Sequence, residues 1–450
     1  MMQFFARSIR HLAGLILQAM RLIAFNRLHL SQFSRLECLR LGRSRLAAVP
    51  ILLFVASALL SSVVLPSCAP GWQGQGGAPH EAIATAAVRP LSTPELLEKS
   101  WTAYRDRFIQ GDGRIIDREA ADRTTSEAQA YALLRAVLMD DADTFARVLN
   151  WGENNLQRRG LDGQRRDYLW AWQWGRNDDN QWLPLDANFA SDGDIDAVTA
   201  LIFAARQWRR SEYLDLAKLK LRDLWNLSVV KVGDRNYLIP GPREVFQQSN
   251  QLYLNPSYFA PYAFRLFAQI DAERDWLSLI KSSYQTLNNS ARLSSLGLPS
   301  NWIALDTTKG QYQPITQPEN LNSRYGYDAY RVWWRVALDA AWFNERQAKR
   351  YLQDHLEPLV NLWQTRQAIP AEINLQGQPL VSYESNAQYA MLYAAFKVID
   401  PEIAEQMRLQ KLLPAFRDGF WENDSAYYIQ NLGWLGLYPP DDVASHWLKP

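Results

Sequence analysis

Cysteine and histidine are scarce in this chain of 450 residues, and their positions exclude two kinds of site. Both cysteines, Cys38 and Cys68, come before residue 69, so no disulfide can form within residues 69–450. The same stretch contains three histidines, and none has a Cys or His partner at the spacing of a zinc site. We therefore expect no metal and no cofactor, and acid–base chemistry would have to use carboxylates.

An excess of positive charge is missing from most of the chain. Residues 1–68 contain eight arginines, no lysine and one acid, Glu37, which gives this stretch a charge of +7. Because the whole chain carries only +1, the remaining residues carry −6. A mildly acidic body disfavours nucleic acid as a partner, since binding to phosphates depends on a basic surface.

Residues 1–68 have the pattern of an export signal. The segment "RLGRSRLAAVPILLFVASALLSSVVLPSC" places a basic flank before an apolar run and small residues, and residues 1–39 extend it towards the N-terminus. Its last four residues, "LPSC", resemble a bacterial lipobox, which predicts lipidation of Cys68. We expect export to the periplasm, as an outer-membrane lipoprotein or a secreted protein. An uncleaved membrane anchor over residues 46–66 is the alternative.

The rest of the chain lacks the patterns of a sheet protein or a solenoid. Residues 69–92 are rich in Gly, Pro and Ala and are predicted to be a flexible linker. Beyond them alternating runs are few, apart from a hairpin expected at 231–241, and no fixed repeat period is present. No Gly/Pro-rich break divides residues 93–450, so we expect one all-α domain.

Helical periodicity dominates this domain. A first helix is expected with Thr93 as its N-cap and Pro94 at its first position. Apolar residues then recur at steps of three and four, which predicts further helices. The segments are 127–149, 194–208, 211–226, 256–270, 273–287, 327–343, 345–363, 384–399 and 424–437.

Three acids stand directly ahead of, or open, such helices. Glu127 follows Thr124 by three residues, the spacing of a capping box, and this structural reading is favoured when the motif is taken alone. In "ASDGDIDAVTALIFAARQW", Ser191 or Asp192 would cap the helix, and Asp194 and Asp196 would interact favourably with its dipole. This structural reading is again favoured when the motif is taken alone. Asp328 could form an ordinary ion pair with Arg331, three residues on.

The aromatic surroundings favour a second interpretation. The chain has 18 Trp, 20 Tyr and 17 Phe, most of which must build the core. The segment "YGYDAYRVWWR" around Asp328 is nevertheless too aromatic for an ordinary solvated face. Sugar rings stack on such side chains while carboxylates transfer protons, so three acids at helix entrances predict a sugar-binding cleft.

Three segments resemble the motifs of glycoside hydrolase family 8. They are "ASDGDIDAVTALIFAARQW", "GRIIDREAADRTTSEAQAYALLRAVLMDD" and "YGYDAYRVWWR", and weaker matches are "LNPSYFAPYAF", "LGLPSNW" and "YYIQNLGWLGL". The matches keep the family's order over nearly all of residues 93–450, although Ala128 stands where glycine is usual. The resemblance implies an (α/α)6 barrel that forms a single catalytic domain.

The resemblance also implies roles for the three acids. Glu127 would be the general acid, Asp328 the general base that activates a water, and Asp192 a hydrogen-bonding partner of the sugar at the cleavage subsite. Asp192 would raise the pKa of Glu127 by repulsion, while Arg331 would keep Asp328 ionised. Inversion at the anomeric carbon requires the acid and base carboxyls to stand roughly 6.5–9.5 Å apart.

Four further residues would bind the substrate by the same resemblance. Tyr327 and Arg331 would position Asp328 and the water, and Trp172 and Tyr258 would be stacking or subsite residues.

The implied activity is endo-acting hydrolysis of β-1,4-glucan by a monomer. A link to bacterial cellulose synthesis would make the cellulose synthase complex a partner. Chitosanase, xylanase or lichenase activity is the alternative within the family. Outside it stand an inactive glucan-binding subunit of a cellulose-export complex and a plain helical scaffold.

Overall fold

The computed structural model describes residues 90–317 and 321–449. The predicted leader (1–68) with Cys68, the predicted anchor at 46–66 and most of the predicted linker (69–92) lie outside the described residues.

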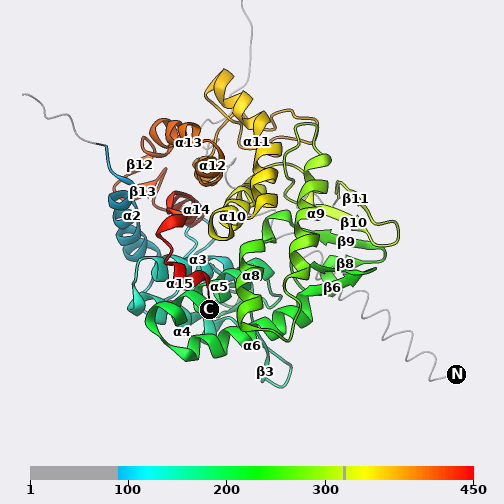
Figure 1. Cartoon of the computed structure of the whole chain (residues 1–450). Coiled ribbons are helices and arrows are strands. Elements are labelled where there is room, and N and C mark those ends of the chain that lie inside the picture. The colour runs from blue at the N-terminus through cyan, green and yellow to red at the C-terminus, as the bar shows by residue number, and fades with distance from the viewer. Residues whose placement is uncertain (1–89, 318–320, 450) are drawn as a thin grey trace, which may run out of the picture. The chain divides into compact units, whose positions relative to one another are not determined.

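Six helices form a closed inner ring in the described part of the chain (Figure 1). Each contacts the next in chain order, and the last contacts the first. They are α3 (Ser126–Leu138), α5 (Ser191–Trp208), α8 (Pro261–Ile270), α10 (Tyr327–Phe343), α12 (Asn386–Ile399) and α14 (Tyr427–Leu437).

Six outer helices cover this ring, one on each inner helix. They are α2 (Thr93–Phe108) on α14, α4 (Ala142–Asn155) on α3, α6 (Ser211–Ser228) on α5, α9 (Ser278–Arg292) on α8, α11 (Arg346–Arg366) on α10 and α13 (Pro401–Met407) on α12. Outer and inner helices alternate along the chain, so the fold is an (α/α)6 barrel. The predicted all-α barrel is confirmed.

Several helix boundaries differ from the prediction. The helix expected at 273–287 is α9, at Ser278–Arg292, and only Pro261–Ile270 of the segment 256–270 is α-helical. Two further differences have local causes. The segment 127–149 forms two helices, because Asp140 adopts a left-handed backbone (φ 55°) and the side chain of Asp141 accepts a hydrogen bond from the Thr144 N–H to begin α4. The first helix has Ser92 as its N-cap, so Thr93 and Pro94 are its first two residues. Glu95 accepts hydrogen bonds from the backbone N–H and hydroxyl of Ser92.

Short strands lie in the connections between helices. Two sheets have the strand orders β1-β4-β5 and β11-β10-β9-β8, and the remaining strands form three hairpins, β2-β3, β6-β7 and β12-β13. The predicted hairpin at 231–241 is confirmed as β6-β7. The strands are β1 (Thr124–Thr125), β2 (Gln157–Arg159), β3 (Arg165–Trp170), β4 (Gln173–Arg176), β5 (Trp182–Asp186), β6 (Val229–Val232), β7 (Arg235–Leu238), β8 (Gln247–Gln248), β9 (Gln251–Leu254), β10 (Ile303–Asp306), β11 (Gln311–Gln313), β12 (Phe416–Arg417) and β13 (Phe420–Trp421).

Five short helical segments complete the described chain. Two of the strands described above lead into inner helices: β1 runs directly into α3, and β9 runs through η1 towards α8. The segments are α7 (Arg243–Phe246), η1 (Pro256–Tyr258), the π-helical η3 (Arg408–Leu412), η4 (Pro440–Asp442) and α15 (Ser445–Leu448).

Aromatic rings fill much of the core, as expected. Six tryptophans are among the largest fully buried side chains, and so are three arginines, Arg135, Arg331 and Arg335. A buried guanidinium needs partners, because a buried charge without them is costly. Two of the three arginines lie on α10, where their partners define the site described next. Among the helices of the described residues, none is both long and apolar enough to cross a bilayer.

Candidate active site

Glu127 does not cap its helix. The N-cap of α3 is Thr125, whose hydroxyl accepts a hydrogen bond from the Ala128 N–H at 3.1 Å. Thr124 belongs to β1, and its hydroxyl donates to the Ile115 carbonyl. The predicted capping box of Thr124 and Glu127 is therefore wrong, since the N-cap lies one residue later, and the Glu127 carboxyl remains available for other contacts.

The start of α5 packs directly against the start of α3. A Cβ atom added to Gly193 would lie 2.7 Å from the Ser126 hydroxyl oxygen and 3.1 Å from the Glu127 nitrogen. A side chain at residue 193 would crowd the backbone of Glu127, so glycine allows the helix ends that carry Asp192 and Glu127 to lie close together. The expected capping by Ser191 or Asp192 is also wrong, because the N-cap of α5 is Ala190 and the Ser191 hydroxyl donates to the Ile239 carbonyl.

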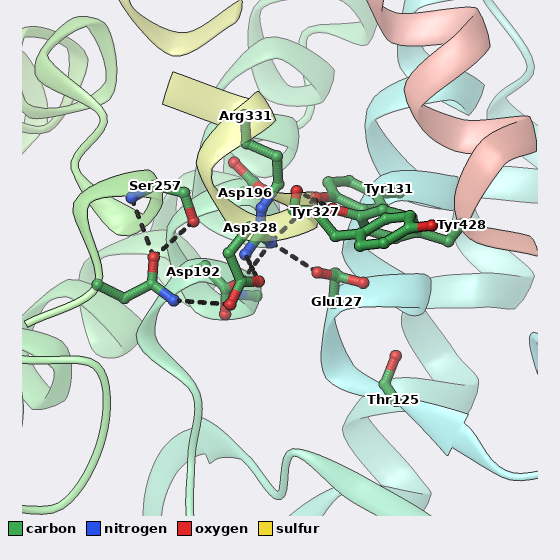
Figure 2. Close-up of polar contacts among 12 residues, drawn as sticks. Thr125, Glu127, Tyr131, Asp192, Asp196, Ser257, Tyr327, Asp328, Arg331 and Tyr428 are labelled. Carbon is green, nitrogen blue, oxygen red and sulfur yellow. Dashed lines mark hydrogen bonds and ion pairs between the residues drawn. The ribbon is translucent and has the colours of Figure 1, made fainter. Parts of the chain in front are cut away.

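Arg331 joins all three predicted acids (Figure 2). Its Nη1 atom donates to Glu127 Oε2 at 2.6 Å and to Asp192 Oδ2 at 2.8 Å. Its Nη2 atom donates to Asp328 Oδ1 at 3.0 Å. The acids come from the N-terminal ends of α3, α5 and α10, where the helix dipoles favour negative charge. The structure therefore brings the four residues into one constellation.

The three carboxyls differ in their access to solvent. The side chain of Asp328 is 35% exposed and that of Glu127 is 19% exposed, whereas Asp192 is 3% and Arg331 1% exposed. A bound molecule could reach Glu127 and Asp328, while the buried guanidinium of Arg331 holds both side chains in place.

Burial gives Glu127 the properties of an acid that titrates near neutral pH. It raises the pKa of Glu127 to about 7, Arg331 and a hydrogen bond from Tyr427 oppose the shift, and Asp192 and Asp328 add to it. The predicted effect of Asp192 has the right sign, but burial is the larger cause. Burial also raises the pKa of Asp192, again against Arg331.

Two predicted substrate-binding residues lie beside these acids. The backbone carbonyl of Trp172 accepts a hydrogen bond from the Ser126 N–H at 3.0 Å, at the helix start that carries Glu127. The guanidinium of Arg331 lies over the ring of Tyr258, 5.4 Å from its centroid. Both positions are compatible with a subsite next to the acids.

Tyr327 makes different contacts from those expected. Its backbone carbonyl accepts a hydrogen bond from the Tyr428 hydroxyl at 3.0 Å, and its ring packs against Tyr330. Burial and then a hydrogen bond with Tyr383 raise the pKa of Tyr327. Its positioning of Asp328 and a water stays a prediction.

Sequence reasoning missed two polar partners of the acids. The hydroxyl of Tyr427, at the start of α14, donates to Glu127 Oε1 at 2.9 Å. The amide nitrogen of Asn255 donates to Asp328 Oδ2 at 3.3 Å. Both residues lie within the weaker motif matches, "YYIQNLGWLGL" and "LNPSYFAPYAF", so a signal for them was present.

A second layer of ion pairs supports the site. Asp196 and Arg335, each one turn beyond an acid or arginine of the site, form a buried bidentate pair with both distances 2.8 Å. Asp194 accepts hydrogen bonds from the Trp170 N–H and from Lys220, and burial raises its pKa to about 7. Both acids have side-chain partners beyond the helix-dipole role predicted for them.

The chemistry available here is proton transfer by carboxyl groups. In residues 90–317 and 321–449, no group of three or more His, Cys, Asp or Glu side chains is arranged to hold a metal ion. The site combines one acid that titrates near pH 7 with a second, partly exposed carboxyl on the same arginine.

Comparison with known proteins identifies relatives of this arrangement. The profile of Glycosyl hydrolases family 8 matches residues 80–434. An endoglucanase of Xanthomonas axonopodis pv. citri is 36% identical over 276 residues, which are 60% of this chain and 67% of that protein. An endoglucanase of Salmonella typhi is 33% identical over 236 residues, 52% of this chain and 60% of its own length. The alignment thus spans about three fifths of the latter.

A solved structure agrees with the fold. The endo-1,4-D-glucanase from Vibrio fischeri ES114 superposes with a TM-score of 0.63 at 25% identity, over 75% of this chain and 93% of that one.

Proposed function

This chain belongs to glycosyl hydrolases family 8, and from that premise we propose that it hydrolyses internal linkages of β-1,4-glucan, with inversion at the anomeric carbon. The observation that carries the proposal is the single arginine, Arg331, that contacts Glu127 and Asp328 at once. One of these carboxyls titrates near pH 7 and the other is solvent-accessible. Hydrolysis with inversion needs one carboxyl that donates a proton and another that activates a water, which supports the assignment of Glu127 and Asp328 to these roles.

In the proposed reaction Glu127 gives its proton to the glycosidic oxygen as the bond to the anomeric carbon breaks. Asp328 takes a proton from a water that attacks that carbon from the opposite face, and the product anomer is inverted. Asp192 hydrogen-bonds the sugar at the cleavage subsite. Trp172 and Tyr258 stack on flanking sugars, and Tyr327 and Arg331 orient Asp328 and the water.

The first test removes the proton donor without changing its shape. General acid catalysis contributes typically 10²–10⁴-fold, so Glu127→Gln is expected to lose at least ~100-fold in kcat on a cello-oligosaccharide while still binding it. NMR of the first product that the wild-type protein forms should show the α anomer. Wild-type cleavage by Glu127→Gln, or a β product, would contradict the pairing of Glu127 with Asp328.

The substrate proposal rests on the relatives, which are named endoglucanases. Chitosanase, xylanase and lichenase activity are the alternatives. Initial rates on carboxymethylcellulose, chitosan, xylan and mixed-linkage glucan separate them. An inactive glucan-binding subunit would bind these polymers with the same affinity in Glu127→Gln and wild type but cleave none.

We further propose that the chain is exported as a monomer and lipidated at Cys68. The basic flank, apolar run and "LPSC" sequence support this placement. A lipid-anchored glucanase in the periplasm would act near the cellulose synthase complex, which is the proposed partner. Metabolic labelling with a fatty acid should mark the wild-type chain and leave Cys68→Ser unlabelled.

A further inference from the structure

Asp328 has a second partner besides Arg331. Arg331 Nη2 donates to one carboxylate oxygen, Oδ1, at 3.0 Å. The side-chain amide of Asn255 donates to the other, Oδ2, at 3.3 Å. Asn255 is only 1% exposed, in the segment that joins β9 to η1. Each oxygen of Asp328 therefore has its own donor, and the two donors together restrict rotation of the carboxylate.

The orientation of the Asn255 amide follows from its other contacts. Its oxygen, Oδ1, accepts hydrogen bonds from the Ser257 N–H at 3.0 Å and from the Ser257 hydroxyl at 2.7 Å. An amide carries an acceptor oxygen at one end and a donor nitrogen at the other. Because two donors hold the oxygen, the nitrogen has to face Asp328. Figure 2 shows Ser257 on the side of Asp328 that lies away from Glu127.

Ser257 is itself fixed to the barrel. Its backbone carbonyl accepts a hydrogen bond from Arg335 Nε at 2.7 Å. Arg335 forms the buried bidentate pair with Asp196 on α5 and also donates to the Tyr262 hydroxyl. A continuous polar chain thus runs from α5 through Arg335, Ser257 and Asn255 to Asp328.

We propose that Asn255 is a positioning residue that sets the angle of the Asp328 carboxylate, so that its free lone pairs face the attacking water. This inference rests on the proposed role of Asp328 as the general base. Catalysis is sensitive to such placement, because a misplacement of about 1 Å can cost on the order of 10²-fold in rate. Asn255 does not touch the sugar in this scheme and acts only through Asp328.

Other charged and titratable groups also face Asp328. Besides Arg331, these are Glu127 on α3 and Asp192 on α5, which share the guanidinium, and the tyrosines Tyr258 on η1 and Tyr428 on α14. None of them binds Oδ2 in the described structure, so the amide of Asn255 supplies an interaction that they do not replace.

Asn255→Asp separates positioning from a merely structural role. Aspartate has the same shape and is an equally good N-cap, so its oxygen can still accept both hydrogen bonds from Ser257. An ionised aspartate cannot donate to Asp328 and places a like charge beside it. We expect kcat on a soluble cello-oligosaccharide to fall about 10- to 100-fold with KM changed by less than about 3-fold. The acid limb of the pH profile should move to higher pH. Tm should fall more at pH 8 than at pH 5, because the added charge is buried beside Asp328, while the protein stays folded at the assay temperature.

Matched variants define the outcome. Asn289→Asp makes the same substitution on outer helix α9, where the amide nitrogen donates to the Gln285 carbonyl, and should leave kcat and the acid limb unchanged. Ser257→Ala removes one of the two bonds that orient Asn255 and should give a smaller loss than Asn255→Asp. Asp328→Asn should abolish hydrolysis.

Two results would overturn the inference in distinguishable ways. Wild-type kcat and pH profile in Asn255→Asp, with Asp328→Asn inactive, would overturn the positioning role alone. Normal hydrolysis by Asp328→Asn would overturn the assignment of the base and the inference together.

Discussion

Glu127 receives two hydrogen bonds that favour its charged form. Arg331 Nη1 donates to Oε2 at 2.6 Å, and the Tyr427 hydroxyl donates to Oε1 at 2.9 Å. Burial outweighs both and raises its pKa to about 7. In the proposed reaction the protonated form is the active one, so the rate should fall as the pH rises through about 7.

Tyr427→Phe tests this balance at the level of one hydroxyl. The variant loses a donor to the carboxylate and keeps the ring, so the pKa of Glu127 should rise further. We expect the basic limb of the kcat/KM profile to move up by about 0.5–1 pH unit, since one unit corresponds to ~1.4 kcal/mol and a hydrogen bond to a charged group contributes about that much. The measurement is hydrolysis of a cello-oligosaccharide from pH 5 to 9.

Tyr428→Phe is the matched control for this prediction. Tyr428 is the next residue on α14, but its hydroxyl donates to the Tyr327 carbonyl rather than to a carboxylate. Its loss should not move the basic limb. A limb that stays in place in Tyr427→Phe, or moves equally in both variants, would contradict the assigned contact.

At the level of elements, the site depends on how closely two helix starts approach. Glu127 and Asp192 stand at the beginnings of α3 and α5, and Gly193 lies at the contact between them. The atoms that a Cβ would meet there include the backbone nitrogen of Glu127, which cannot rotate away. A methyl group at this position would crowd the backbone of Glu127 and push the two helix starts apart by a few tenths of an ångström.

Gly193→Ala should therefore lower kcat/KM strongly and the free energy of unfolding only moderately. We expect kcat/KM to fall about 10- to 100-fold, because the acids shift relative to Arg331, and the free energy of unfolding to fall by ~1–3 kcal/mol, as for overpacking elsewhere. Kinetics and thermal unfolding of the same preparation measure both. Gly111→Ala is the control, since a Cβ there meets nothing within 4 Å. Equal losses in the two variants would contradict the packing argument.

Apolar periodicity predicted most helices because the inner and outer helices each bury a continuous apolar stripe. It missed the break at Asp140, where the apolar pattern continues across a change in chain direction. It also missed most of the strands, many of which are only two to four residues long, too short for alternation to be recognised. These boundaries depend on tertiary packing rather than on local sequence.

The site was predictable only in part for the same reason. Glu127, Asp192, Asp328 and Arg331 lie in recognisable motifs, and the structure brings them together. Tyr427 lies 300 positions from its partner Glu127, and Asn255 lies 73 positions from Asp328. The weaker motifs mark both residues, but no spacing rule connects positions so far apart, so the pairing itself could be found only in the folded barrel.

At the level of the whole molecule, buried acids and paired acids pull stability in opposite directions with pH. Burial raises the pKa of Glu127 and of Asp194 to about 7. Such groups take up protons on folding, so their destabilising effect is largest above pH 7 and disappears as the pH falls towards their unfolded values near 4. Acids with lowered pKa values, such as Asp140 and Glu405, stabilise above those values and lose the effect in stronger acid.

Glu127→Gln isolates one of these effects in a calorimetric experiment. At pH 8 the wild-type Glu127 is ionised and shares one guanidinium with two other acids, and a neutral amide at this position removes its buried charge. We expect the variant to be more stable at pH 8 by on the order of 1–3 kcal/mol. At pH 5, where wild-type Glu127 is protonated, the difference should vanish. Glu98→Gln, on the exposed side of α2, should leave stability unchanged at both pH values. A stability difference for Glu127→Gln that is constant between pH 5 and 8 would mean that Glu127 does not titrate in this range, and the acid proposed for catalysis would lose its physical basis.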